Sequence, residues 1–160
     1  GTTKNEYARY SEEGAVYVRN VQRLLRKFET AKKLVPAPEL IKSSGEARHG
    51  VIFFGSTSPS MREALELLER RGIPLDALRV RAFPFGAEVE EFIAQHDRIY
   101  VVEQNRDAQL RTLLVNELNV DPVRLVPVLN YDGTPITARF ISQAIAEVEG
   151  VGSAAPRKAP

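Results

Sequence analysis

The feature that most constrains the fold of this chain is a regular alternation of short apolar runs with longer amphipathic stretches. The first run, Val51-Ile52-Phe53-Phe54, is apolar throughout, which is typical of a strand buried on both faces of a sheet. Further strands are predicted at 78–83, 99–102 and 126–129. In 78–83, Arg79 and Arg81 alternate with apolar residues, which suggests one wetter face or a sheet edge. Because strands that alternate with helices form parallel sheets with right-handed crossovers, we predict an α/β fold: a three-layer open, mainly parallel sheet of about four or five strands.

Apolar residues three and four positions apart predict the helices between these strands. The first begins at Ser58-Pro59, an N-cap followed by proline at the first helical position, and ends at Gly72. Further helices are predicted near 89–96, 110–118 and 140–148. A helix therefore follows each predicted strand, as parallel connections require.

A long helix precedes this pattern. Ser11 is its predicted N-cap, and an apolar stripe runs from Val16 to Phe28. The remaining surface of this helix is strongly basic, with Arg19, Arg23, Arg26, Lys27, Lys32 and Lys33. Two interpretations fit this surface: a solvated face with cations near the helix C-terminus, or a docking face for an acidic partner.

Prolines and polar residues mark the predicted domain boundaries. Pro36 and Pro38 end the long helix, and 42–48 reads as a short polar linker. We therefore predict a leading segment with the basic helix and linker over 1–48, an α/β domain over 49–149, and a disordered tail over 150–160. The chain starts at Gly1 without a methionine, so we expect it to be a piece of a larger protein.

The composition excludes several kinds of site. The chain has no cysteine, which rules out disulfides, thiol catalysis, cysteine-ligated zinc and iron–sulfur clusters within it. Its two histidines, His49 and His96, lack the spacing of a metal pair, so no metal site is predicted. We expect a structural or solvent-exposed role for His49. We expect His96 to act as a cation at the negative end of a helix dipole.

The net charge and the lack of a long apolar stretch limit the kinds of partner that the chain is expected to bind. The net charge is +1, from 22 basic and 21 acidic residues, which gives no general attraction to nucleic acid or anionic membranes. No stretch approaches the roughly 20 apolar residues that cross a bilayer. Because the absence of cysteine fits a reducing compartment, we expect a cytoplasmic protein that binds neither nucleic acid nor membrane.

Ligands of open α/β sheets collect beyond the carboxyl ends of the strands. The loop after the first predicted strand places Ser56, Thr57 and Ser58 before a helix N-terminus, where their groups could bind phosphate or carboxylate. The loop lacks both the Gly-x-Gly-x-x-Gly pattern and the Gly-Lys-Ser/Thr ending of a P-loop. Ordinary helix capping is the alternative interpretation.

A second polar group, Glu103-Gln104-Asn105-Arg106, directly follows the apolar run at 99–102. Arg106 could clamp a carboxylate or phosphate with two parallel hydrogen bonds. The alternative is a hydrogen-bonded turn or a subunit contact.

Tyr131 and Asp132 stand at the end of the last predicted strand and complete the candidate substrate edge. Asp132 precedes a glycine in a common turn signal, so we expect it to form a turn rather than act as a base. No nucleophile and base come together in these loops, and we predict no catalytic residue.

Several segments, in their order and spacing, resemble the alpha subunit of 2-oxoacid:ferredoxin oxidoreductases, and most of all the 2-oxoglutarate-using branch. The matching segments are Asn5–Tyr7, Arg26–Pro36, Phe54–Thr57, Tyr100–Asp107 and Tyr131–Ala138. The resemblance extends over nearly the whole chain except its end. One departure is that the family commonly has a histidine shortly before the glutamate of the first motif, where this chain has Lys4 before Asn5 and Glu6.

The resemblance implies a fold like the C-terminal domain of transketolase. It also implies a parent enzyme that oxidatively decarboxylates a 2-oxoacid to an acyl-CoA and passes the electrons to ferredoxin. Thiamine diphosphate, Mg and iron–sulfur clusters would serve that enzyme, mostly on other domains or on the beta subunit, and this chain alone would bind none of them. Its partners would be the upstream domains of the same alpha chain and the beta subunit, with ferredoxin and CoA for the whole enzyme.

Three hypotheses follow. The leading one is a non-catalytic structural and assembly domain of a 2-oxoacid:ferredoxin oxidoreductase, inactive when isolated. The second is a small-molecule module that holds the phosphates of CoA or a nucleotide with Ser56, Thr57, Ser58 and Arg106. The third is the matching domain of a transketolase or of a thiamine-dependent 2-oxoacid dehydrogenase.

Overall fold

The computed structural model describes residues 1–151, which form two compact units. The smaller unit consists of Gly1–Pro36 together with Ala82–Gly86, and the larger unit contains the other described residues. From residue 152 onward, the disordered tail predicted over 150–160 lies outside the described residues.

The larger unit is built on a five-stranded sheet with the order β3-β5-β4-β6-β7. Its strands are β3 (Glu39–Ile41), β4 (His49–Phe54), β5 (Leu75–Val80), β6 (Arg98–Glu103) and β7 (Leu125–Leu129). All neighbouring pairs are parallel except β3 and β5, which are antiparallel. The predicted open, mainly parallel α/β sheet is confirmed.

Two strands differ from the sequence prediction. β3 adds an edge strand upstream of His49, where we expected the α/β domain to begin. β5 covers 75–80 rather than 78–83, because Asp76 interrupts the apolar pattern at its start. The Asp76 carboxylate accepts hydrogen bonds from Lys42 Nζ (2.6 Å) and from the backbone N–H of Ser43 (3.0 Å). These partners allow a buried carboxylate inside a strand.

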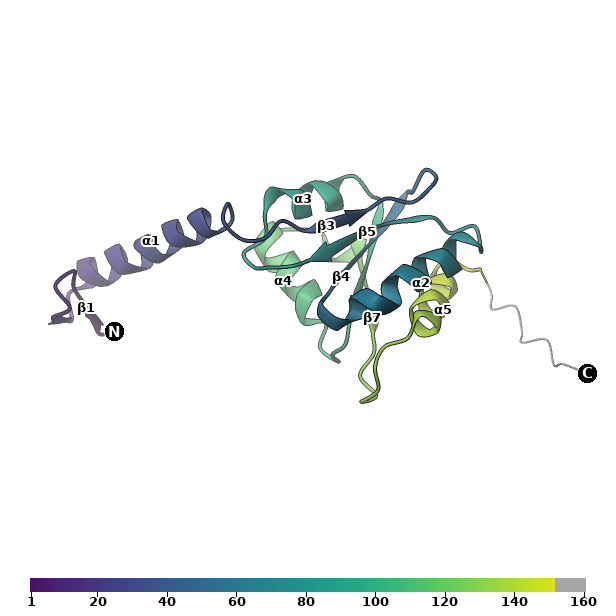
Figure 1. The fold of residues 1–160 in the computed structure, drawn as a ribbon. Helices are drawn as coiled ribbons and strands as arrows, with labels where there is room; N and C mark the ends of the chain where they lie inside the picture. Colours follow the sequence, from purple (N-terminus) through teal and green to yellow (C-terminus); the bar gives the residue numbers. More distant parts are fainter. Residues whose placement is uncertain (152–160) are drawn as a thin grey trace, which may run out of the picture. The chain divides into compact units, whose positions relative to one another are not determined.

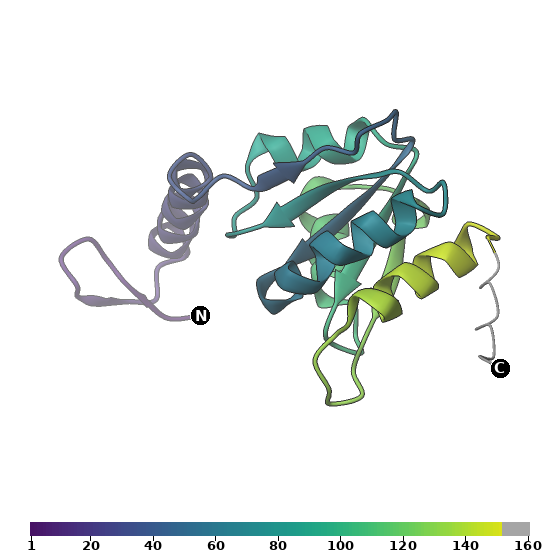
Figure 2. The same cartoon turned by 45° about the vertical axis from the view of Figure 1, so that its right-hand side comes forward.

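Helices cover both faces of the sheet (Figure 1). α2 (Ser58–Glu69) and α5 (Ala138–Val148) lie on one face, and α3 (Ala87–Ala94) and α4 (Gln109–Leu118) on the other, as Figures 1 and 2 show. Short 3₁₀ turns, η1 (Gly55–Thr57) and η2 (Pro122–Arg124), lead into α2 and β7. α2 starts at Ser58, and its N-cap residue is Thr57, whose side chain makes no capping hydrogen bond to the helix backbone, so the predicted Ser58 cap is wrong.

The main core lies between the sheet and the α2–α5 pair. It joins alternate residues of β4 and β6 to apolar residues of the two helices, among them Val51, Phe53, Tyr100, Met61, Leu68, Ile141 and Ile145. On the α3 side, β4 runs so close to the helix that a Cβ atom at Gly50 would lie 2.8 Å from the ring of Phe92. Glycine is therefore the residue that fits at that crossing.

The smaller unit contains a two-stranded hairpin and a long helix. The hairpin pairs β1 (Thr3–Lys4) with β2 (Tyr10–Ser11), and the helix is α1 (Gly14–Ala31). The long leading helix is thus present, but Glu13 rather than Ser11 occupies its N-cap position, because Ser11 belongs to β2. Within residues 1–151, no helix is both long enough and apolar enough to span a membrane.

Most of the apolar stripe of α1 is exposed. Val16 is its only buried residue. The exposed apolar residues are Tyr17, Val18, Val21, Leu24, Leu25 and Phe28. The Phe28 ring makes an edge contact with Phe83, which in turn contacts Phe85 in the 82–86 loop of the same unit.

Candidate functional site

The loops at the carboxyl ends of β4, β6 and β7 meet around the side chain of Gln104. Its amide Nε2 donates to the Ser56 hydroxyl (3.0 Å) and to the Thr57 hydroxyl (3.2 Å). Its Oε1 accepts from the backbone N–H of Ile136 at 3.5 Å. Gln104 therefore ties together two loops that lie far apart in the sequence, and the sequence alone did not indicate this role.

Glu103 is fully buried and serves as the cap of α4. Its carboxylate accepts hydrogen bonds from the backbone N–H groups of Leu110 (2.7 Å) and Arg111 (3.0 Å), and from the Asn105 amide (2.8 Å). The N-cap residue of this helix, Ala108, has no side-chain acceptor, so Glu103 supplies it from the preceding strand. The negative charge also faces the positive end of the helix.

Arg106 points its guanidinium into solvent, where 75% of the side chain is exposed. Its Nε atom lies 2.8 Å from a carboxylate oxygen of Asp107. In the described part of the chain, no hydrogen bond joins Arg106 to Ser56, Thr57 or Ser58. The residues predicted to hold a phosphate thus lie on neighbouring loops, and the structure does not connect them through a direct contact.

The loop after β7 forms the turn that the sequence predicts. One carboxylate oxygen of Asp132 accepts from the backbone N–H of Thr134 (2.9 Å) and from its hydroxyl (2.8 Å). These hydrogen bonds favour the charged form and hold the pKa of Asp132 below its usual value. Tyr131 beside it is 64% exposed and makes no hydrogen bond within residues 1–151.

The loops that follow β4, β6 and β7 are called the rim below. Both histidines lie in charged clusters away from this rim. His96 is buried, with Nδ1 2.7 Å from the Phe92 carbonyl at the end of α3 and Nε2 3.3 Å from Asp76. The carbonyl contact fits the predicted place at a helix end. The burial and the Asp76 pairing were missed, because Asp76 stands twenty residues earlier in the sequence.

His49 lies at the amino ends of the strands, 2.8 Å from a carboxylate oxygen of Glu149. Burial raises the pKa of the Glu149 carboxyl, but the hydrogen bond from Tyr100 and the charges of His49 and Arg98 outweigh it, so this pKa lies below its usual value. Burial and the hydrogen bond to Glu149 raise the pKa of Tyr100 to about 12. The cluster anchors the end of α5 to the sheet.

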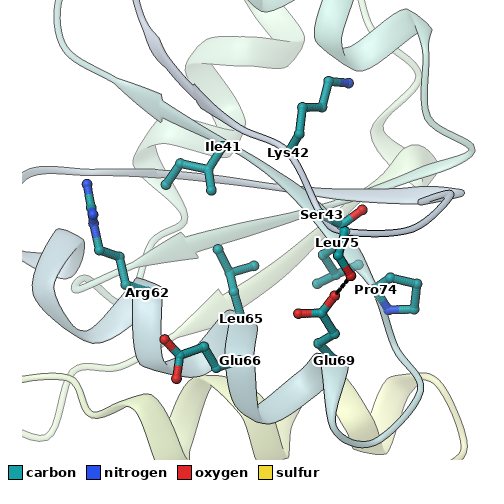
Figure 3. A pocket seen from close by; sticks show the side chains of 10 residues that line it. Ile41, Lys42, Ser43, Arg62, Leu65, Glu66, Glu69, Pro74 and Leu75 are labelled. Carbon is teal, nitrogen blue, oxygen red and sulfur yellow. Dashed lines mark hydrogen bonds between the residues drawn. The ribbon is translucent and has the colours of Figure 1, made fainter.

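Three hollows on the larger unit lie away from the predicted rim residues. The first, of about 440 Å³, lies between α2 and residues 41–44 (Figure 3). A second of about 310 Å³ lies beside His49 and Glu149, and a third of about 200 Å³ lies between β3 and α3. Among residues 1–151, no three histidine or acidic side chains come together in a way that could hold a metal ion.

Known proteins resemble this chain both in sequence and in structure. No family model matches the chain. It is 28% identical over 156 residues to "2-oxoacid:ferredoxin oxidoreductase 2, subunit alpha" of Aeropyrum pernix, covering 95% of this chain and 24% of the relative. The chain therefore spans about a quarter of the length of that curated relative.

The structural similarities establish the fold. A 2-oxoglutarate:ferredoxin oxidoreductase from Magnetococcus marinus, solved with 2-oxoglutarate, coenzyme A and succinyl-CoA bound, matches 90% of this chain and 25% of its own. The TM-score is 0.78 and the identity 23%. A split-gene transketolase matches 71% of this chain and 41% of its own, with a TM-score of 0.56 and 19% identity. In sequence over nearly its whole length, and in fold, the chain resembles part of the alpha subunits of 2-oxoacid:ferredoxin oxidoreductases.

Proposed function

We propose that this chain is a non-catalytic assembly domain of a 2-oxoacid:ferredoxin oxidoreductase alpha subunit. Its similarity to the Aeropyrum alpha subunit supports this assignment. The parent enzyme would convert a 2-oxoacid, of which 2-oxoglutarate is our first candidate, to an acyl-CoA in the cytoplasm. The upstream part of the alpha chain and the beta subunit would be the immediate partners of the domain.

The observation that carries the non-catalytic role is the internal use of the polar groups at the rim. Glu103 caps α4, Gln104 bridges two loops, and Asp132 holds its own turn. A general base needs a lone pair that can reach a substrate proton, and both oxygens of Glu103 and one oxygen of Asp132 already accept from N–H or hydroxyl groups of the chain. Ser56 receives its hydrogen bond from an amide, which cannot activate a nucleophile.

The residues of the chain do not fit the redox cofactors of the parent enzyme. Iron–sulfur clusters are held by cysteine thiolates, and the sequence contains none. Thiamine diphosphate binds together with a magnesium ion, and within residues 1–151 no three histidine or acidic side chains gather into a metal site. We assign both groups, and the electron transfer to ferredoxin, to other parts of the enzyme.

The exposed stripe of α1 supports the assembly role. Its apolar residues recur three and four positions apart along the helix, and each of them except Val16 is at least 41% exposed. The basic residues of α1 lie on its other side. A stripe of this kind is typical of a helix that packs against a partner through one face and keeps the other in water.

The test uses the full-length alpha subunit expressed with its beta subunit. We would assay CoA-dependent reduction of a viologen dye by several 2-oxoacids, with wild type and with Ser56→Ala and Tyr131→Phe at the rim. We expect activity with one oxoacid, and both variants should keep wild-type turnover per assembled complex. A loss of about 100-fold or more in turnover, with assembly intact by size exclusion, would show that the rim takes part in the chemistry.

A second candidate function, binding the phosphates of CoA or a nucleotide, is favoured by the 75% exposed side chain of Arg106, which stands two residues after the Gln104 that contacts Ser56. Calorimetric titration of CoA into the chain and into its Arg106→Ala variant distinguishes the two functions. The assembly role predicts no binding to either protein. Binding to wild type with a loss of about tenfold or more in the variant would favour the binding role.

A further inference from the structure

The two edges of the sheet differ in how well they are closed. The outer strand β7 contains Pro127, whose missing N–H prevents regular pairing with a further strand. The opposite edge strand, β3, has no proline among its three residues, and Pro36 and Pro38 stand before it. Leu40 at its centre is 52% exposed. The β3 edge is therefore the one that can take up another strand.

Hollows flank β3 on both faces of the sheet. On the α2 side, Ile41 and Leu65 form part of the floor of the 440 Å³ hollow, and Figure 3 shows Leu65 reaching from α2 toward residues 41–44. On the α3 side, Leu40, Leu78 and Phe92 form the floor of the 200 Å³ hollow. Successive side chains of a strand point to opposite faces, so a strand added at this edge would fill both hollows alternately.

The charged residues around each hollow determine which side chains of an added strand would fit there. On the α3 side, Glu88 and Glu91 line the hollow, and neither forms an ion pair within residues 1–151. An apolar floor with free carboxylates at its edge fits a Lys or Arg side chain, whose stem is apolar and whose head is cationic.

The charges on the α2 side already have partners. Arg62 pairs with Glu39 at 3.3 Å, and Lys42 pairs with Asp76 at 2.6 Å. The Ser44 hydroxyl donates to Glu69. A side chain entering this hollow therefore finds paired charges around an apolar floor, which favours an uncharged apolar residue such as valine.

From this geometry we propose that the β3 edge binds an extended segment of a partner chain with the pattern apolar–basic–apolar, its basic side chain seated between β3 and α3. The segment is not a second copy of β3. That strand reads Glu-Leu-Ile, carries no Lys or Arg, and would bring further carboxylates to Glu88 and Glu91. The proposal goes beyond the assembly function and stands on the larger unit alone.

The first experiment uses a fluorescein-labelled peptide, Thr-Val-Arg-Val-Thr, titrated with the chain and followed by fluorescence anisotropy. We expect saturable binding that falls about tenfold when the arginine of the peptide is replaced by glutamate. The double variant Glu88→Gln/Glu91→Gln should lose about tenfold in affinity for the arginine peptide. Glu90→Gln, a matched change on the same helix outside the hollow, should stay within about twofold.

Three results would overturn the proposal. One is the absence of saturable binding up to about 1 mM chain. Another is an equal loss in the Glu90→Gln protein, because general attraction to an acidic helix would explain it. The third is unchanged affinity for a peptide whose backbone amides are N-methylated, because a paired strand needs those donors. Slower amide hydrogen exchange at residues 39–41 in the complex would support the strand pairing.

Discussion

Helices α1 and α5 carry the same apolar periodicity, but it has opposite consequences for burial. In α5, Ile141 and Ile145 are fully buried against the sheet and α2. In α1, Val21 is 41% exposed and Leu25 is 61% exposed. Amphipathic spacing thus shows that a helix has an apolar face to bury, but it does not show which part of the protein covers that face. For α5 that partner lies within the larger unit, whereas the other residues of the smaller unit leave most of the α1 stripe exposed.

The largest expected difference between the two helices comes from the same kind of truncation in each. Ile145→Ala should lower the free energy of unfolding by about 2–5 kcal/mol, because it leaves a cavity in the core. Leu25→Ala should change it by no more than about 0.5 kcal/mol, because the side chain is already in water. Urea unfolding of both variants tests this. If Leu25→Ala proves as destabilising as Ile145→Ala, the stripe of α1 is covered within the chain and the comparison fails.

The sequence predicts an element well when its pattern is local, and poorly when its burial depends on residues far away in the chain. The apolar runs at 51–54 and 99–102 identified β4 and β6, because a strand buried on both faces has few polar residues. Asp76 hid the start of β5, because the Lys42 and Ser43 groups that make its burial tolerable come from a distant segment. β3 was missed because three residues are too few to show a period.

For the rim, too, the sequence predicts where the residues lie but not what their side chains do. The sequence predicted that Glu103, Gln104 and Asn105 gather at the sheet edge, which follows from their place after a buried strand. It could not predict that Glu103 caps α4, because that role depends on the missing acceptor at Ala108 and on the path of the loop between them. Whether Ser56, Thr57, Ser58 and Arg106 bind a ligand remains a prediction.

A pair of glycine substitutions gives a smaller effect of opposite sign in the two units. Gly50→Ala should destabilise the chain by about 1–3 kcal/mol, because the new Cβ would meet the Phe92 ring at 2.8 Å. Gly14→Ala, in α1, meets nothing within 4 Å and should stabilise the chain by up to about 1 kcal/mol through helix propensity. Thermal unfolding by circular dichroism measures both changes. A stabilising Gly50→Ala would mean that α3 moves freely away from β4.

The smallest effect concerns acid stability and the ends of the two helices. The Glu149 carboxylate at the end of α5 has a lowered pKa, with partners in His49, Tyr100 and Arg98. A carboxyl whose pKa is lower in the folded state contributes stability above its unfolded pKa of about 4.3, and this stability is lost as the pH falls through the folded pKa. Glu149→Gln should therefore be less stable than wild type at pH 7, and the difference should shrink below about pH 4.

The matched change in α1 is Glu29→Gln, which removes an exposed pair with Lys32. Exposed pairs of this kind contribute about 0–0.5 kcal/mol, so this variant should follow wild type at every pH. Urea unfolding between pH 3 and pH 7 compares the three proteins on the same scale. If the gap between Glu149→Gln and wild type stays constant over this range, the contribution of Glu149 is packing rather than charge, and the end of α5 is held by contacts that a glutamine cannot make. If Glu29→Gln shows the larger pH dependence, the charges of α1 are in a drier environment than their exposure indicates, and the proposal that other parts of the enzyme cover α1 would have to be abandoned.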